Sequence, residues 1–443
     1  MFILCSTISG SQSPSLRGQT GASKFLKNRK DYISSNYCFW GSIITGSNKR
    51  YDGYKSFQYL EAGRDYKQFK LAKEIGRVKE YKVPLSKDEE DRAKELQAKL
   101  ICISLHDHTD VNPDDITQIR EWTRENRIST GFEGLAASGL DAVFDGLLDG
   151  TNTVISKRPW HWDSLIYELG VRLSDLAHQK MVILGRNVED IRRAHKDGLI
   201  AFIPSIEGAA EIENDLERID VLHGLGVRML GLVYSESNAI GSGLAEKNDA
   251  GLTDFGYEVV ERMNKIGMAI DIAHVGDQTS LDAIEASKVP VFISHAGARS
   301  LWPAKRMKSD EVLEALANKK GVIGIEASPH TTLTEKHKSH SLESVMEHFQ
   351  YVEKRFGIDY VTFGPDTMFG DHVGLHHVFT SELSMSKDQA DIPFEEVPYV
   401  NGLENPGEFF NIIRWLVKHG YSDSEIEKAV GGNTLRVLEK VWK

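Results

Sequence analysis

The sequence has little cysteine and no long apolar run. Its three cysteines, Cys5, Cys38 and Cys102, lie far apart and form no Cys-x-x-Cys pair, so neither a disulfide framework nor a thiolate zinc site is indicated. No segment approaches the roughly 18 consecutive apolar residues that a membrane-spanning helix needs. The apolar residues 1–5 lack the basic region and the longer apolar region of a signal peptide. We therefore expect a cytoplasmic protein that is not bound to a membrane.

Positive charge is also scarce. The 443 residues include 53 Lys and Arg against 65 Asp and Glu, which gives a formal net charge of −12. This sign is unfavourable for binding a phosphate backbone or an anionic lipid surface, so nucleic acid is not an expected partner. With 40% hydrophobic and 27% charged residues, the composition is that of an ordinary globular protein with a sizeable core.

The chain divides by composition near residue 86. Residues 1–85 are expected to be a partly irregular N-terminal extension, and the Ser-, Gly-, Asn- and Lys-rich stretch 6–51 is interpreted as disordered. The segment SKDEEDRAKELQAK (86–99) predicts a capped helix, because Ser86 precedes an acidic first turn and apolar residues recur at helical spacing. Residues 86–443 are expected to form a single domain.

Short apolar runs alternate with amphipathic stretches through this domain, as repeated βα units do. Eight runs are found, at residues 100–110, 140–148, 199–208, 227–235, 268–275, 289–297, 321–328 and 360–366. Helical spacing of apolar residues is clear at 162–179, 253–267 and 342–357. Eight strands favour a closed (β/α)8 TIM-like barrel. An open doubly wound sheet is the alternative, but the Gly-rich turn typical of dinucleotide binding does not follow the first run.

The chain after the eighth run has two parts. Residues 368–406 are too long and irregular for a plain connection, so they are predicted to form a lid-like insertion near the site. Residues 406–420 and 422–442 have helical patterns and are expected to pack outside the barrel.

Residues that can bind metals stand at the ends of five apolar runs. They are His108, Asp110, Glu207, His274, His295 and Asp366. In a barrel these ends meet at the mouth where active sites lie. A single buried histidine is more often a core residue, but the joint placement is hard to explain by chance. One zinc ion takes about four ligands, so this set predicts two ions, with Glu207 giving one oxygen to each.

The first run offers two ligand pairs, because His106, His108 and Asp110 lie on one face of an extended strand. The His106-x-His108 pair resembles the His-x-His of many metal-dependent amidohydrolases. The other pair is His108 with Asp110, which lie nearer the C-terminal edge of the strand, and it is favoured by the family resemblance given next.

Several segments in order carry a resemblance to a known family. They are HDHTD, SIEG, GLTDFGYEVVERMNKIGMAIDIAHV, VPVFISHAGARSL and GGNTLRVLEKVW. From about Leu100 to its C-terminus the chain resembles the membrane (renal) dipeptidase family of zinc peptidases, in the amidohydrolase superfamily. The resemblance implies that residues 86–443 are a metal-dependent hydrolase domain holding two zinc ions. His108, Asp110 and Glu207 would bind one ion, and Glu207, His274 and His295 the other.

The resemblance also implies an activity, the hydrolysis of dipeptides with a free C-terminal carboxylate. A metal-bridging hydroxide would attack the peptide carbonyl, and Asp366 would pass a proton to the departing amine. Arg306 would bind the substrate carboxylate, which suits a guanidinium fork. Zinc is the expected metal, although these ligands also admit manganese, cobalt or iron.

Two positions depart from the family pattern. Tyr234 stands where the family has a histidine that contacts substrate; its phenol would either donate a hydrogen bond to an oxyanion or simply fill the wall of the mouth. GPDTMFGD keeps Asp366 but loses a second acidic position, for which Asp371 is a candidate substitute. The histidines of the following segment, His372, His376 and His377, are interpreted mainly as surface or lid residues.

Two other functions stay open. The first is hydrolysis of another amide, such as an N-acyl amino acid, because the metal centre does not itself select the acyl group. The second is a non-catalytic metal-binding scaffold that uses its N-terminal segment to contact partners. The sequence leaves a homodimer open.

Overall fold

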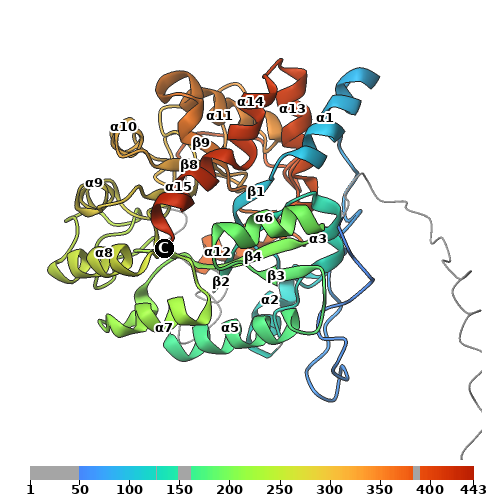
Figure 1. The fold of residues 1–443 in the computed structure, drawn as a ribbon, viewed down its shortest axis with the longest axis horizontal. Helices are drawn as coiled ribbons and strands as arrows, with labels where there is room; N and C mark the ends of the chain where they lie inside the picture. Colours follow the sequence, from blue (N-terminus) through green and yellow to red (C-terminus); the bar gives the residue numbers. More distant parts are fainter. Residues whose placement is uncertain (1–48, 126, 148–160, 383–389) are drawn as a thin grey trace, which may run out of the picture. The chain divides into compact units, whose positions relative to one another are not determined.

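The computed structural model describes residues 49–125, 127–147, 161–382 and 390–443. Eight parallel strands form a nearly closed barrel. Helices surround this barrel (Figure 1). The strand order is β1-β2-β4-β5-β6-β7-β8-β9. The strands are β1 (Ile103–Asp107), β2 (Ala142–Leu147), β4 (Ile200–Ile206), β5 (Met229–Gly231), β6 (Ala269–Asp271), β7 (Phe292–Ala296), β8 (Val322–Ile325) and β9 (Val361–Phe363). Each of the eight apolar runs contains one of them, so the predicted barrel is confirmed.

The first and last strands meet just beyond their ends. The backbone N–H of Asp366 donates to the carbonyl of His106 at 3.0 Å, and that of His108 donates to the carbonyl of Thr367 at 2.8 Å. These bonds hold the segment after β9 against the segment after β1. The candidate residues of the first and eighth runs therefore lie side by side.

The structure contains a further short strand, β3 (Val182–Leu184), which pairs with β4 outside the barrel path. Its three residues are too few to produce a clear alternation in the sequence, and it was not predicted. It lies beside the first half of β4 and contributes no candidate site residue.

Most helices lie on the outside of the barrel. They are α1 (Lys87–Lys99), α2 (Ile119–Glu125), α3 (Phe132–Ser138), α5 (Trp162–Leu176), α6 (Val188–Asp197), α7 (Glu217–Leu225), α8 (Asp254–Ile266), α9 (Asp277–Ala286), α10 (Asp310–Asn318) and α11 (Leu342–Phe356). Helix α1 has the expected capping box between Ser86 and Glu89. Thr253 caps α8 at its start, and Gly267 follows its end with φ 82°, a left-handed conformation that suits glycine. The predicted helical patterns are thus confirmed.

Four α-helices follow the last strand in the part of the chain that the structure describes. They are α12 (His372–Glu382), α13 (Phe410–Lys418), α14 (Asp423–Glu427) and α15 (Asn433–Val441). Helix α13 packs on α1. Val437, Leu438 and Val441 of α15 share one apolar cluster with strand-starting residues such as Ile103 and Phe292. Helix α15 therefore covers the amino-terminal end of the barrel and leaves the opposite end for polar side chains.

The described part of the N-terminal extension packs on this barrel. Lys49 belongs to the same compact unit as the barrel and pairs with Asp141 at 2.6 Å. The hydroxyl of Tyr54 donates to Asp175 of α5 at 2.6 Å. Residues 1–48, which include nearly all of the stretch expected to be disordered, lie outside the described residues, and the boundary at residue 86 stays a prediction.

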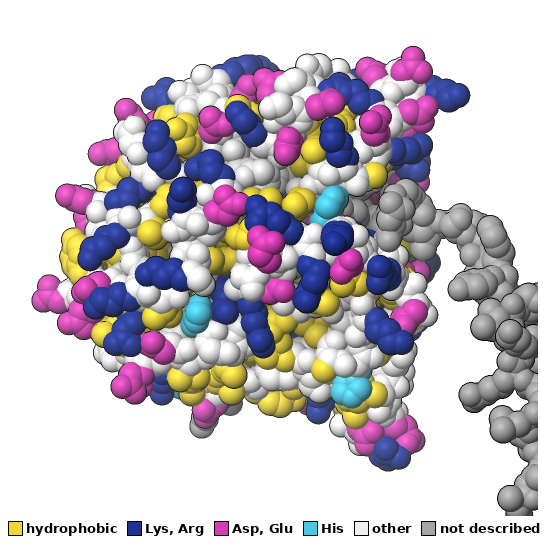
Figure 2. Space-filling view, viewed as in Figure 1, with side chains coloured by type: hydrophobic (Ala, Val, Ile, Leu, Met, Phe, Trp, Pro, Cys, Tyr) yellow, Lys and Arg dark blue, Asp and Glu magenta, His cyan; other side chains and the backbone are white. Residues whose placement is uncertain are grey.

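The visible surface mixes charges of both signs. Figure 2 shows acidic and basic side chains interspersed on one face, with scattered apolar side chains between them. Within the described part of the chain, no helix has the length and apolar character required to span a bilayer.

Candidate metal centre

The carboxyl ends of the barrel strands bring histidines and carboxylates together in a buried cluster. His106 and His108 come from β1 and its end, Glu207 follows β4, His274 follows β6, and His295 lies in β7. Each of these five residues has at most 6% of its surface exposed. The polar ends of strands that are otherwise apolar thus share one enclosed space.

Glu207 lies between two sets of imidazoles. Its Oε1 is 3.6 Å from Nε2 of His108, and its Oε2 is 3.1 Å from Nε2 of His274. Nε2 of His295 lies 3.8 Å from the same Oε2 and 3.0 Å from Nε2 of His274. One oxygen of Glu207 therefore faces the first strand, and the other faces the fifth and sixth barrel strands, β6 and β7.

A hydrogen-bond chain behind His295 sets its tautomer. The hydroxyl of Ser294 donates to Asp271 at 2.5 Å, so its oxygen accepts from Nδ1 of His295 at 2.7 Å. The proton of a neutral His295 then resides on Nδ1, and the Nε2 lone pair points into the cluster. Such backing by a carboxylate is typical of metal-binding histidines.

The same logic applies to His108. Its Nδ1 lies 3.2 Å from the carbonyl of Gly146 in β2, which can only accept a hydrogen bond. The proton is therefore placed on Nδ1, and Nε2 is left as an acceptor toward Glu207.

Burial controls the charge of the second pair of imidazoles. Desolvation lowers the pKa of both His274 and His295 well below 6.5, and the positive charge of Arg306 lowers it further. Both rings are therefore neutral at pH 7, which is the form that binds a metal ion.

Asp366 lies at the first-strand side of the cluster. Its Oδ1 is 3.4 Å from Nε2 of His106 and 3.3 Å from Nε2 of His108. Burial opposes its ionisation, but the contacts with His106 and His108 outweigh burial and hold the pKa of Asp366 well below its usual range. Its φ of 56° lies in the left-handed region, a strained conformation that is common at functional sites.

His106 also belongs to the cluster. Its ring stacks on that of His295 with the centroids 3.7 Å apart. The ligand atoms of His106, Glu207 and His295 lie within 4.8 Å of one another, as do those of His106, His108 and Asp366. The His-x-His alternative of the first strand therefore has a structural basis beside the favoured pair.

Asp110 is buried just beyond β1, with 6% of its surface exposed. It lines a small cavity together with Gly146, Glu168 and Arg172. Arg172 donates to Asp145 at 2.6 Å and to Thr109 at 2.8 Å, which anchors the turn that carries His108 and Asp110. The role of Asp110 as a metal ligand stays a prediction.

Arg306 is buried near the cluster and already has an anionic partner. Its Nη2 lies 2.7 Å from Glu326 and donates to the carbonyl of His295 at 2.8 Å. Glu326 also accepts hydrogen bonds from Thr331 at 2.9 Å and Thr332 at 3.1 Å. A substrate carboxylate that reached Arg306 would have to share its guanidinium with Glu326.

Glu326 was not singled out from the sequence. Its carboxylate groups with His295 and Asp366, with ligand atoms within 4.8 Å of one another. It directly follows β8, as Glu207 follows β4. That shared position at the end of an apolar run is the feature that would have identified it.

Tyr234 and Asp371, which belong to the two departures from the family pattern, lie in different surroundings. The ring of Tyr234 stacks on His274 with centroids 4.1 Å apart, so Tyr234 lies at the cluster. Asp371 instead accepts from the backbone N–H of Gly374 at 3.0 Å and stabilises the start of α12. Among the histidines of α12, His372 and His376 are buried and His377 is exposed. The first two are therefore not surface residues, and their interpretation as lid residues stays a prediction.

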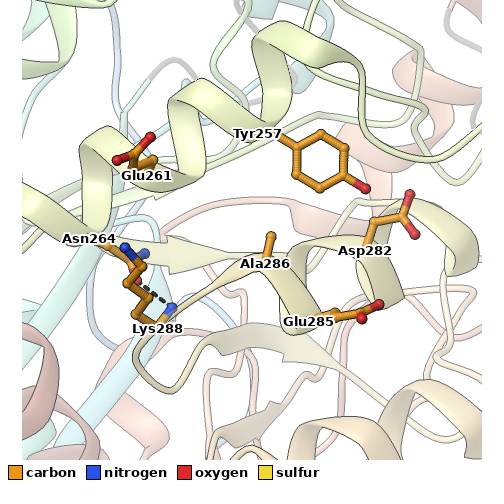
Figure 3. Close-up of a pocket in the computed structure, with 7 residues that line it drawn as sticks. All are labelled: Tyr257, Glu261, Asn264, Asp282, Glu285, Ala286 and Lys288. Carbon is orange, nitrogen blue, oxygen red and sulfur yellow. Dashed lines mark hydrogen bonds between the residues drawn. The ribbon is translucent and has the colours of Figure 1, made fainter.

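A separate groove of about 590 Å³ lies between α8 and α9 (Figure 3). It is lined by Tyr257, Glu261, Asn264, Asp282, Glu285, Ala286 and Lys288. These side chains come from outer helices and the turn after α9, whereas the Glu207 cluster is built from strand ends. We place no catalytic role in this groove.

The Glu207 cluster has the donor atoms and spacing of a divalent-metal site. Ligand atoms around a tetrahedral zinc with bonds of about 2.0–2.1 Å lie roughly 3.3 Å apart. The separations of 3.0, 3.1 and 3.8 Å among Glu207, His274 and His295 match this spacing. Neutral imidazoles and carboxylates are ligands that zinc accepts.

Comparison with known proteins agrees with this chemistry. The family model described as membrane dipeptidase (peptidase family M19) matches residues 90–383. Dipeptidase tcpJ of Claviceps purpurea (strain 20.1) is 29% identical over 273 residues, which are 61% of this chain and 57% of that protein. The match thus spans less than two thirds of that relative.

Solved structures show the same fold. An amidohydrolase from Pseudomonas aeruginosa is 26% identical with a TM-score of 0.65, covering 79% of this chain and 99% of that one. A metallo peptidase from Rhodobacter sphaeroides, liganded with a phosphinate mimic of the dipeptide L-Ala-D-Ala, is 18% identical with a TM-score of 0.57. That alignment covers 77% of this chain and 99% of the other.

Proposed function

Because this chain belongs to the membrane dipeptidase family, peptidase family M19, we propose that it is a binuclear zinc dipeptidase. Its substrates would be short peptides, and water would split their amide bond into a carboxylic acid and an amine. His108, Asp110 and Glu207 would hold one ion, and Glu207, His274 and His295 the other. The bound ions would lower the pKa of water and polarise the scissile carbonyl.

The observation that carries this proposal is the placement of Glu207. Its Oε1 faces His108 at 3.6 Å and its Oε2 faces His274 at 3.1 Å. A carboxylate whose two oxygens face separate sets of imidazole nitrogens is arranged to serve two ions at once.

Asp366 would move the proton in this reaction. Its low pKa keeps it ionised at neutral pH, so it is able to accept a proton from the attacking water and return it to the departing amine. His106, 3.4 Å away, would hold the carboxylate in place. Tyr234, whose ring stacks on that of His274, would donate a hydrogen bond to the developing oxyanion.

The experiment that tests the proposal is the substitution Asp366→Asn. We expect kcat for a dipeptide panel to fall by about 10²–10⁴-fold, because general acid–base catalysis is lost. Zinc content, measured by mass spectrometry of the purified chain, should stay near that of the unmodified protein. Full activity in the variant, or no hydrolysis by the zinc-loaded unmodified chain, would refute the proposal.

The pairing of Arg306 with Glu326 favours a second candidate, hydrolysis of an amide whose departing part has no free carboxylate. Arg306 is neutralised at 2.7 Å by Glu326, which leaves a substrate anion with less attraction. A panel of free dipeptides and their C-terminal amides, compared by kcat/KM, separates the candidates, and N-acyl amino acids, which keep the free carboxylate, test the need for a free amine. The dipeptidase proposal requires that free dipeptides be preferred over their C-terminal amides. It also requires that Glu326→Gln increase this preference.

A further inference from the structure

A second cluster of metal-binding side chains lies outside the Glu207 cluster. It consists of His330 in the loop after β8, His377 of α12 and Glu396 in the segment beyond α12. One ligand atom from each lies within 4.8 Å of the other two. These side chains come from three separate segments and share no residue with the hydrolytic site.

His330 is the most unusual member of this cluster. It is 3% exposed, and among the residues that the structure describes neither of its ring nitrogens has a hydrogen-bond partner. Its φ of 69° is a left-handed conformation that costs free energy in a residue other than glycine. Two buried polar atoms without partners are also costly, so the fold keeps this imidazole in place at a loss of stability.

Glu396 lies between the two imidazoles. Its Oε1 is 2.8 Å from Nε2 of His377, and its Oε2 is 3.7 Å from Nε2 of His330. A distance of 3.7 Å is too long for a hydrogen bond but suits two ligands of a common ion after a small side-chain rotation.

The surroundings favour a neutral imidazole at His330. The rings of His340, His376 and Phe394 lie 5.1, 5.7 and 5.5 Å from it. Burial lowers the pKa of His330 to about 4, so its ring offers a lone pair at pH 7. His377 and Glu396 are exposed, which gives an ion a path from solvent.

We propose that His330, His377 and Glu396 form a separate binding site for a divalent transition metal ion of the zinc class. Two imidazole nitrogens and one carboxylate oxygen supply three ligands, and water completes four-coordination. The ion fastens α12 to the loop after β8 and to the segment that contains Glu396. It gives the buried nitrogen of His330 a partner and stabilises the wall of the barrel mouth.

The test uses exposed ligands, whose replacement leaves the core intact. His377→Ala and Glu396→Gln should each lower the zinc bound per chain by one equivalent after zinc loading and gel filtration. Glu395→Gln is the matched control, because Glu395 is also an exposed carboxylate in the same segment. Unchanged zinc content in both ligand variants would overturn the proposal.

Cobalt titration gives a second readout that does not depend on activity. Two nitrogens and one oxygen around Co²⁺ in a four-coordinate site produce visible absorption. The Glu396→Gln variant should bind the Co²⁺ ion of this site more than about tenfold more weakly than the unmodified protein. Titration identical to that of the Glu395→Gln control would contradict the site. The hydrolytic proposal is judged separately, since His274→Ala would remove metal there and leave the His330 site occupied.

Discussion

At the first strand, His106 and Asp110 compete for the place beside His108. His106 contacts Asp366 at 3.4 Å and stacks on His295, an arrangement that suits a residue orienting the proton carrier. We expect Asp110→Asn to remove one zinc equivalent per chain. We expect His106→Gln to retain both equivalents while kcat falls, because Asp366 loses its partner.

Metal analysis of the two purified variants decides between these roles. If His106→Gln loses an ion and Asp110→Asn does not, the His-x-His interpretation of the first strand is correct. Asp110→Asn keeps the size of the side chain, so the turn that Arg172 anchors through Thr109 should stay in place.

Lys308 lies beside the site with a buried ammonium group. Its Nζ donates to the carbonyl of Val275 at 2.7 Å, while desolvation lowers the pKa of Lys308 from 10.5 to about 7. The unfolded chain therefore takes up this proton as pH falls from about 10.5 toward 7, and the folded chain does not. Folding stability is lost over that window.

Replacing Lys308 by Met should cancel this loss. The difference in free energy of unfolding between Lys308→Met and the unmodified protein should be larger at pH 7 than at about pH 9.5, by up to roughly 3 kcal/mol. Urea unfolding at both pH values measures it. Lys305→Met is the control, because Lys305 is exposed in the same loop, and equal pH profiles for the two variants would contradict the assignment.

Single residues also mark the limit of prediction from sequence. The proximity of His108, Glu207, His274 and His295 was predictable because strand direction alone brings their backbone positions to one end of the barrel. The Arg306–Glu326 pair and the hydrogen bond from His295 to Ser294 depend on side-chain rotamers and on contacts between different strands. No spacing in the sequence reports such contacts.

At the scale of elements, periodicity predicted the barrel strands and the outer helices well. It did not identify α12, because buried histidines on this helix interrupt its apolar face and Gly374 weakens the pattern. Histidines replace ordinary core residues on the buried side of this helix.

Helix α15 offers a direct test of the apolar core at the amino-terminal end of the barrel. Leu438 is fully buried among residues that begin the barrel strands. Leu438→Ala should lower the free energy of unfolding by about 2–5 kcal/mol, the usual cost of a buried leucine truncation. Chemical denaturation measures this change.

Lys440→Ala, on the exposed side of the same helix, controls for helix propensity. The two variants should differ clearly in denaturation midpoint, while zinc content stays unchanged in both. A Leu438→Ala variant as stable as the control would show that α15 does not close the barrel.

At the scale of the whole molecule, the two ends of the barrel have opposite characters. The amino-terminal end is closed by apolar contacts with α15, and the carboxyl end gathers histidines and carboxylates. This division was predictable, because parallel strands have one direction and the ligand candidates all end their runs. The first 48 residues have no periodicity that assigns them to either end.

The same division predicts how the protein responds to metal removal. Without cations, the carboxylates of Glu207, Glu326 and Asp366 share one cluster of ligand groups, in which Glu207 and Glu326 are buried. The mouth therefore loses stability, while the apolar core at the amino-terminal end of the barrel is unaffected. Ions that bind only the folded chain add about 2.7 kcal/mol each at one hundred times Kd. Exhaustive chelation should therefore abolish hydrolysis and lower Tm by about 5 °C or more, with the far-ultraviolet circular dichroism spectrum retained. Added zinc should restore both properties; a chelated protein with unchanged Tm and full activity would contradict a metal-dependent site.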